Sequence, residues 1–201
     1  QAKAQRATWP QQPVWLAAST HEHEEASILK IHAALSALHP QALLLWAPRH
    51  PERFGTVASQ AEAIGYICTR RSLQAWPDSR TQIFIIDTLG ELPGFMPYAD
   101  VVFVGGSLQA IGGHNVMEPA ANGIAILVGP HTKNFSDSVN ALKDSGGLIQ
   151  SPDAETLQVA LLDLLEDAPR RLKMAKANTD AVARNRGALE KTKALVARRL
   201  A

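Results

Sequence analysis

The chain has 201 residues, of which 46% are hydrophobic and 19% charged, and its formal net charge is +1. That length is enough to bury one sizeable core, so we expect a single soluble globular domain. No stretch approaches the roughly 18 uninterrupted apolar residues of a membrane-spanning helix, and no signal peptide is recognisable. The single cysteine, Cys68, lies in an apolar run. It excludes a disulfide framework, favours a reducing compartment, and predicts a buried strand thiol rather than a nucleophile.

The two ends of the chain differ in character from its middle. Residues 170–201 contain ten Lys or Arg residues against two acidic ones. A solvated helix face explains this, and a surface that meets an anionic membrane or a phosphorylated substrate is the alternative. Residues 1–13 are polar and contain two prolines. They predict a linker, so we expect residues 14–201 to be the folded domain, excised from a longer protein.

Short apolar runs alternate with helical patterns along residues 14–201, which is typical of parallel strands joined by crossover helices. The apolar runs predict strands at residues 14–18, 42–47, 66–69, 83–86, 101–104 and 125–128. Helices are expected at residues 24–38, 51–64, 91–98, 118–122, 135–145, 154–165, 169–183 and 189–200. This order predicts an α/β fold, a Rossmann-like doubly wound parallel sheet of about six strands. Ligands bind such sheets at the carboxyl ends of the strands.

Polar and special residues gather in the loops that follow the predicted strands. Because the carboxyl ends of parallel strands share one edge of the sheet, we expect these loops to converge on a binding site. In chain order the candidates are Ser19, Thr20, His21, Pro48, Arg49, His50, Leu89, Gly90, Glu91, Gly112, Gly113, His114, Asn115, Val116, Met117, Glu118 and Lys133.

Several candidates suit a nucleotide, although each also has a structural explanation. Arg49 offers a planar fork of donors for a phosphate or carboxylate, but an Arg at a strand end also forms ordinary surface ion pairs. A helix that begins near Asn115 would point free N–H groups at a phosphate. Glu118 would accept hydrogen bonds from ribose hydroxyls, but the helix dipole alone also favours an acid there. Gly90 and Glu91 could read the edge of a base or simply begin a helix.

Other kinds of site fit the sequence less well. The segment from His21 to Glu25 holds residue types that bind metals, but alternate residues at a helix entry point in different directions, so we expect no metal there. The first strand lacks the Gly-x-Gly-x-x-Gly that NAD or FAD binding requires. A P-loop for triphosphates and the Gly-x-Ser-x-Gly elbow of hydrolases are also absent from the sequence.

Taken together, the loops resemble the C-terminal domain of the bacterial transferases that add 3-deoxy-manno-octulosonic acid (Kdo) to lipid A. The most specific matches are GGSLQAIGGHNVMEPAANG at residues 105–123 and GPHTKNF at residues 129–135. The segments STHEHEE, APRHPERF and DTLGEL precede them in the expected order, starting at Ser19, Ala47 and Asp87. The resemblance covers residues 14–200.

This resemblance implies the C-terminal half of a GT-B glycosyltransferase that binds the donor CMP-Kdo without a metal. In the family, CMP is held by segments that correspond to Pro48 and Arg49, to Leu89, Gly90 and Glu91, and to Asn115, Val116, Met117 and Glu118. Candidate contacts with the donor sugar or its loops are Ser19, Thr20, His21, His50, Gly112, Gly113, His114 and Lys133.

The resemblance also implies partners for the whole enzyme. The acceptor would be a lipid A precursor at the cytoplasmic face of the inner membrane, where the basic C-terminal helices would lie near anionic lipid. The general base and the lipid-binding surface belong to an N-terminal domain, so no catalytic residue is expected here, and no nucleic-acid partner is implied. Two alternatives stay open: a donor domain for a UDP-sugar transferase or epimerase of the same fold, and a non-catalytic nucleotide-binding module.

Overall fold

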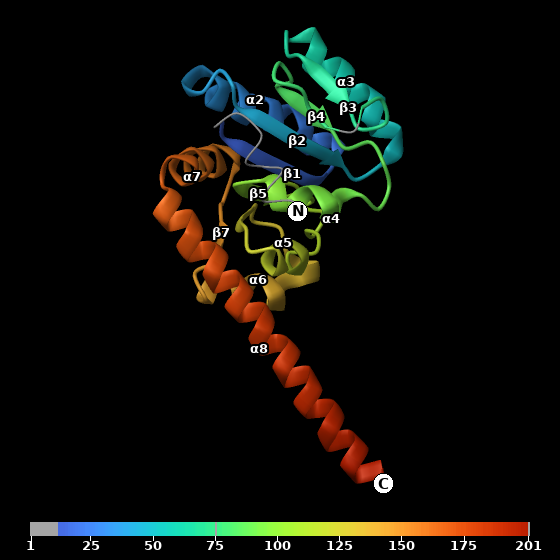
Figure 1. The fold of residues 1–201 in the computed structure, drawn as a ribbon, viewed down its shortest axis with the longest axis vertical. Helices are drawn as coiled ribbons and strands as arrows, with labels where there is room; N and C mark the ends of the chain where they lie inside the picture. The colour runs from blue at the N-terminus through green and yellow to red at the C-terminus, as the bar shows by residue number, and fades with distance from the viewer. Residues whose placement is uncertain (1–11, 75, 201) are drawn as a thin grey trace.

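The computed structural model describes residues 12–74 and 76–200, with side chains as far as Arg184. Within these residues, seven parallel strands form one sheet in the order β3-β4-β2-β1-β5-β6-β7 (Figure 1). The strands are β1 Val14–Thr20, β2 Leu43–Pro48, β3 Cys68–Arg70, β4 Ile83–Ile85, β5 Val101–Val104, β6 Ala125–Val128 and β7 Leu148–Gln150. The α/β doubly wound fold predicted from the sequence is confirmed.

Helices cover both faces of this sheet. The α-helices are α2 Glu22–Leu38, α3 Phe54–Ala63, α4 Leu92–Phe95, α5 Met117–Ala121, α6 Ser136–Asp144, α7 Ala154–Glu166 and α8 Ala168–Leu200, and the short 3₁₀ helices are η1 Pro51–Arg53, η2 Met96–Tyr98 and η3 Lys133–Phe135. In Figure 1, α8 runs from α7 past α6 and extends beyond the sheet. None of the helices in the described part of the chain is both long and apolar enough to span a bilayer.

Alternating side chains on each strand divide the core into two layers. On β1, Trp15 and Ala17 pack with apolar residues of α2, α3 and α7, whereas Leu16 and Ala18 pack with residues of α4, α5 and α6. All four side chains are buried. Since both faces of the sheet are covered, the central strands read as continuous apolar runs, which is why the sequence located them well.

The order of the strands places the reversal point of the sheet between β1 and β5. On one side of β1 the chain forms β2, then the edge strand β3, and then β4 between those two; it then crosses to β5, β6 and β7 on the other side. β1 pairs directly with both β2 and β5. Loops after these strands therefore diverge at their carboxyl ends, where doubly wound sheets bind their ligands.

The structure differs from the sequence predictions at the C-terminal end of the chain. The three-residue strand β7 was not expected, because so short a run has no readable period. One continuous 33-residue helix, α8, replaces the two predicted helices. Residues 1–11 of the predicted linker lie outside the described residues, as do the side chains of the basic segment beyond Arg184.

Candidate functional site

A pocket of about 300 Å³ lies at the reversal point of the sheet. It brings together five of the predicted site residues: Ser19, Arg49, His114, Asn115 and Glu118. Apolar side chains supply much of the remaining wall, and the lining residues other than these five are Ala18, Leu92, Met96, Val104, Pro119 and Phe135. Convergent polar groups on an apolar wall are typical of small-molecule sites.

The ends of β1 and β5 approach each other so closely that residue 105 must be glycine. A Cβ on Gly105 would lie 2.6 Å from the carbonyl oxygen of Ser19 and 2.7 Å from the Cα of Thr20. Ser19 itself has a φ of 56°, which is uncommon for a residue other than glycine. Left-handed backbone at such a residue is often found at functional sites, where the surrounding structure holds it in place.

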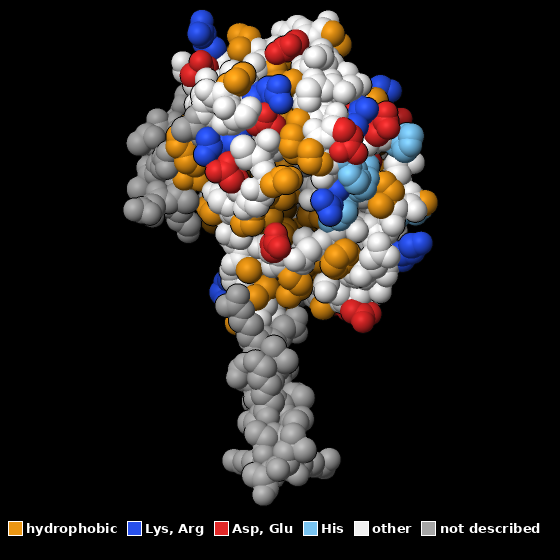
Figure 2. Space-filling view, turned by 90° about the vertical axis from the view of Figure 1, so that its right-hand side faces the viewer, with side chains coloured by type: hydrophobic (Ala, Val, Ile, Leu, Met, Phe, Trp, Pro, Cys, Tyr) orange, Lys and Arg blue, Asp and Glu red, His pale blue; other side chains and the backbone are white. Residues whose placement is uncertain are grey.

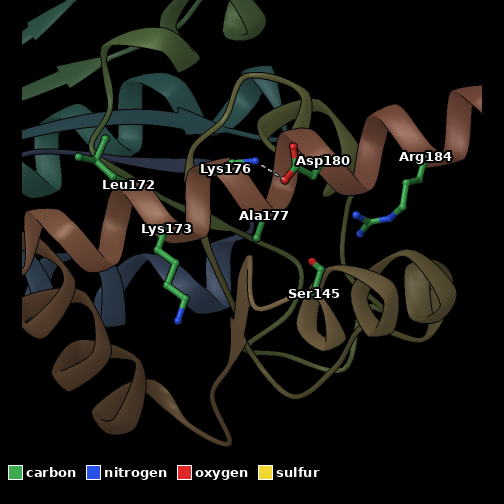
Figure 3. Close-up of a pocket in the computed structure, with 7 residues that line it drawn as sticks. All are labelled: Ser145, Leu172, Lys173, Lys176, Ala177, Asp180 and Arg184. Carbon is green, nitrogen blue, oxygen red and sulfur yellow. Dashed lines mark hydrogen bonds and ion pairs between the residues drawn. The ribbon is translucent and has the colours of Figure 1, made fainter.

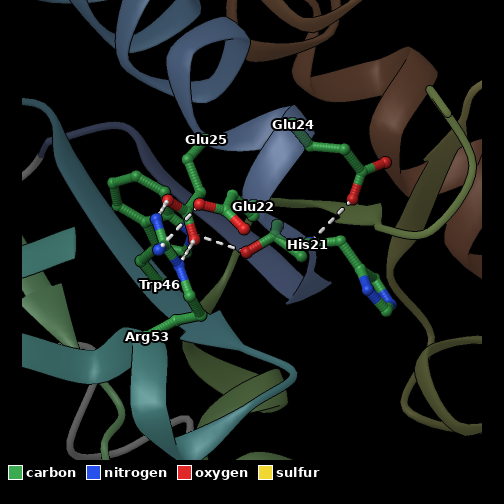
Figure 4. A network of polar contacts seen from close by, with 7 residues as sticks. His21, Glu22, Glu24, Glu25, Trp46 and Arg53 are labelled. Carbon is green, nitrogen blue, oxygen red and sulfur yellow. Dashed lines mark hydrogen bonds and ion pairs between the residues drawn. The ribbon is translucent and has the colours of Figure 1, made fainter. Parts of the chain in front are cut away.

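Glu24 joins the loop after β5 to the start of α2. Its carboxylate is fully buried, and its Oε2 accepts a backbone hydrogen bond from His21 at 3.0 Å (Figure 4). The backbone of the loop donates from Gly106 to Oε2 at 2.8 Å, and from Ser107 and Leu108 to Oε1 at 3.0 and 2.9 Å. Backbone donors of this kind satisfy a buried carboxylate without a counter-ion. This role of Glu24 was not predicted from the sequence.

The neighbouring carboxylates bind an arginine that sequence reasoning also missed. Arg53 donates from Nε and Nη2 to the two oxygens of Glu25, at 3.0 and 2.5 Å, and from Nη1 to Glu22 at 3.0 Å (Figure 4). The hydrogen bond to Glu25 raises the pKa of Arg53. These contacts occupy the carboxylates that resembled metal ligands, and no group of three metal-ligand side chains is found in the described residues.

Arg49 differs from Arg53 because its charge is uncompensated. Its backbone N–H donates to the carbonyl of Thr20 at 2.9 Å, which fixes the end of β2 against β1. Its side chain lines the pocket and makes no hydrogen bond or ion pair with any residue that the structure describes. The guanidinium is therefore free to bind an anion that enters the pocket.

Three histidines surround this arginine. The Nε2 atoms of His21 and His114 are 2.8 Å apart, and the two ring planes are nearly parallel, 3° apart, with a centroid distance of 5.1 Å. His50 contacts His21 edge to face at the same centroid distance. Figure 2 shows histidine side chains gathered beside a basic side chain on one face of the molecule. Burial lowers the pKa of His114 to about 4 and also lowers the pKa of His21, so both rings are neutral near pH 7.

Asn115 and Glu118 form a small hydrogen-bonded unit at the start of α5. The Asn115 Oδ1 accepts from the backbone N–H of Met117 at 2.9 Å, and its Nδ2 donates to Glu118 Oε1 at 3.3 Å. Both side chains are exposed and line the pocket. Because α5 has only five residues, its dipole is small, and the attraction for an anion depends mainly on Arg49.

The loop after β4 lies outside the pocket lining, although Leu92, the first residue of α4, is part of it. Gly90 has a φ of 79°, and the side chain of Leu89 is 76% exposed. Glu91 accepts hydrogen bonds from the Thr88 hydroxyl and, at 2.9 Å, from Arg71 Nη2. The hydrogen bond from Thr88 lowers the pKa of Glu91. Its carboxylate thus holds the loop together.

The remaining predicted residues do not line the pocket. Thr20 is buried and its hydroxyl accepts from Trp46 Nε1 at 2.8 Å. A Cβ on Gly112 would lie 2.5 Å from Nδ2 of Asn134, so this glycine lets the loops after β5 and β6 pack together. Lys133 is exposed in η3. Outside the lining are also His21, Pro48, His50, Gly113, Val116 and Met117.

A larger hollow, of about 590 Å³, lies along α8 (Figure 3). Its charged side chains are Lys173, Lys176, Asp180 and Arg184, and Lys176 is paired with Asp180 at 2.6 Å. Ser145, which also lines it, precedes β7 and so lies toward the amino ends of the strands. This hollow contains none of the predicted site residues, and the smaller pocket is the better candidate despite its size.

Comparisons with known proteins show which proteins this chain is similar to. No protein-family model matches the chain. The 3-deoxy-D-manno-octulosonic acid transferase of Haemophilus influenzae is 39% identical over 188 residues, which are 92% of this chain and 44% of that protein. The enzyme of the same name from Bordetella pertussis is 39% identical over 184 residues, 90% of this chain and 43% of that protein.

A solved structure extends the match to three dimensions. The crystal structure of the C-terminal CMP-Kdo binding domain of WaaA from Acinetobacter baumannii superposes with a TM-score of 0.83 at 29% identity, and the match covers 90% of this chain and 95% of that one. The chain belongs to the Kdo transferase family. It spans less than half the length of the curated Kdo transferases it matches. The family resemblance predicted from the sequence motifs is thereby confirmed.

Proposed function

We propose that this chain is the donor-binding domain of a glycosyltransferase that moves Kdo from CMP-Kdo to a lipid A precursor in lipopolysaccharide biosynthesis. The observation that carries the proposal is the uncompensated Arg49 guanidinium in the pocket at the reversal point of the sheet, opposite Asn115 and Glu118. The relative from Acinetobacter baumannii, which covers nearly the same residues, is described as a CMP-Kdo binding domain.

Each part of a CMP moiety has a suitable partner here. Arg49 binds the phosphate and stabilises the negative charge that develops on CMP as it leaves, which is electrostatic stabilisation rather than proton transfer. Glu118 accepts hydrogen bonds from the ribose hydroxyls. The backbone at Leu89, Gly90 and Glu91 is open to the edge of the base. This donor site needs no metal, because the arginine supplies the positive charge.

The rest of the reaction belongs to the N-terminal domain of the family. The general base and the lipid-binding surface lie there, and the acceptor is a lipid A precursor at the cytoplasmic face of the bacterial inner membrane. The basic residues of α8 would lie near anionic lipid in that arrangement.

Calorimetric titration of the chain with CMP, UMP, UDP and cytidine tests the donor site. We expect selective binding of CMP, weakened roughly tenfold or more in Arg49→Ala because a charge-assisted hydrogen bond to the phosphate is lost. Glu118→Ala should weaken CMP and cytidine alike, whereas Arg49→Ala should leave cytidine unchanged. The exposed Arg80 provides a matched control, and Arg80→Ala should bind as the unchanged chain does. A preference for UDP, or no discrimination among the nucleotides, would overturn the proposal.

A further inference from the structure

His21 and His114 form a pair of imidazole rings joined through their Nε2 atoms, and His114 lines the pocket. One ring comes from the start of α2 and the other from the loop between β5 and α5, and their Nε2 atoms are 2.8 Å apart. A hydrogen bond between two imidazole nitrogens requires one to carry a proton and the other to have a free lone pair. With both rings neutral, the pair therefore holds opposite tautomers, one with its proton on Nε2 and the other with its proton on Nδ1.

The surrounding backbone is shaped to hold this pair. Gly106 has a φ of 66°, and a Cβ there would lie 3.0 Å from the ring of His114. Glu24 Oε2 accepts from the backbone N–H of Gly106 and from that of His21, so a single buried carboxylate oxygen sets the position of both ring-bearing segments. The Glu24 carboxylate thus positions both rings.

The charges that face the pair come from each neighbouring element. Arg49 and His50 follow β2, Glu24 belongs to α2, and Glu118, on α5, lines the same pocket as His114. Burial, followed by the interactions with His21 and Arg49, lowers the pKa of His114 to about 4. Both oxygens of Glu24 are committed to backbone donors. An anion beside the rings would counter the effect of Arg49 and favour an imidazolium.

We propose that His21 and His114 bind the carboxylate of the donor sugar, and that one of them takes up a proton from solvent as the carboxylate binds. The inference rests on the proposed function, because an octulosonic acid linked to CMP carries two anions, a phosphodiester and a carboxylate. Among the side chains that line the pocket, Arg49 is the one Lys or Arg, and in the proposed function it binds the phosphate. Once protonated, the pair exchanges its N–H···N bond for N–H···O bonds to the two carboxylate oxygens.

Calorimetry with CMP and with CMP-Kdo tests this step. Titrations near pH 6 and near pH 8, each in two buffers of different ionisation enthalpy, measure the protons taken up per ligand. We expect CMP-Kdo to take up more protons than CMP near pH 8, where the phosphate monoester of CMP is already a dianion and contributes no proton of its own. Its affinity should fall as the pH rises, by up to about tenfold per pH unit, whereas the affinity for CMP should not show this fall. Equal proton uptake by the two ligands would overturn the inference and leave the proposed function intact.

Substitutions locate the protonated group. His114→Gln and His21→Gln should each weaken CMP-Kdo roughly tenfold more than CMP and abolish the extra proton uptake, since glutamine donates a hydrogen bond but cannot become charged. His23, exposed in the first turn of α2, is the matched control, and His23→Gln should behave as the unchanged chain. Equal weakening of both ligands would contradict the carboxylate role. If CMP itself fails to bind, the proposed function falls, and this inference with it.

Discussion

His32 lies fully buried on α2, where its Nδ1 accepts a hydrogen bond from Trp15 Nε1 at 3.3 Å. Burial lowers the pKa of this histidine from 6.5 to about 4. The unfolded chain therefore binds a proton below about pH 6.5 that the folded chain does not bind until the pH approaches 4. Acid selectively stabilises the unfolded state within that window.

From this linkage we expect the free energy of unfolding to fall by about 2 kcal/mol between pH 7 and pH 5 through His32 alone. Urea unfolding at the two pH values measures the loss. His32→Asn should be less stable at pH 7 but should lose less on acidification, because the asparagine does not titrate. His23→Asn, at an exposed position, should follow the unchanged chain. The same acid sensitivity in His32→Asn would show that other groups cause it.

Single residues also show where sequence reasoning stops. Arg49 and Glu118 were located because each follows a strand or begins a helix at the expected place. The hydrogen bonds of Glu24 were not predicted. They come from the backbone of Gly106, Ser107 and Leu108, which lie more than eighty residues further along the chain. An acidic residue in the first turn of a helix looks the same in a sequence whether it points to solvent or into a loop, so the sequence pattern alone could not reveal these hydrogen bonds of Glu24.

At the scale of elements, one asparagine docks α8 against the sheet. Asn178 is fully buried, and its Nδ2 donates to the carbonyl oxygens of Ile124 at 2.7 Å and Gly147 at 2.8 Å, just before β6 and β7. A Cβ on Gly147 would lie 1.9 Å from Asn178 Oδ1, so the glycine makes room for the amide. The amide therefore joins the long helix to two strands at once.

Asn178→Ala should lower the free energy of unfolding by about 1–3 kcal/mol, because it removes the side-chain donor to the buried Ile124 carbonyl and the shorter of two hydrogen bonds to the buried Gly147 carbonyl. Thermal and urea unfolding measure the change. Asn140, exposed on α6, gives a control of the same residue type, and Asn140→Ala should have little effect. If the two variants lost equal stability, the amide would not be what holds α8 in place.

The elements differ in whether their own residues or contacts with distant residues determine them. All six predicted strands are present, since buried parallel strands are marked by their own apolar residues. β7 is different, because its three residues gain their structure from pairing with β6. Asn178 likewise reads as an unremarkable polar residue in a helix, and its contacts with Ile124 and Gly147 come from tertiary packing.

At the scale of the whole molecule, the open pocket suggests that this chain binds the donor and that a second domain completes the site. Its volume of about 300 Å³ is at the lower end for sites that enclose a small ligand, so much of a nucleotide sugar bound here would stay uncovered. In the relatives, more than half of the length lies outside the match to this chain. The uncovered side of the sugar is where a second domain and an acceptor would approach.

We therefore expect the 201-residue chain to bind CMP-Kdo but to transfer no Kdo to a lipid A precursor, because the proposed function assigns the general base to an N-terminal domain. Mass spectrometry of the lipid after incubation with CMP-Kdo would detect each added Kdo, and the full-length Haemophilus influenzae relative serves as the positive control. Transfer by the chain alone would mean that a base lies within these residues. The neutral His21–His114 pair, beside the expected position of the sugar, would then be the first group to substitute.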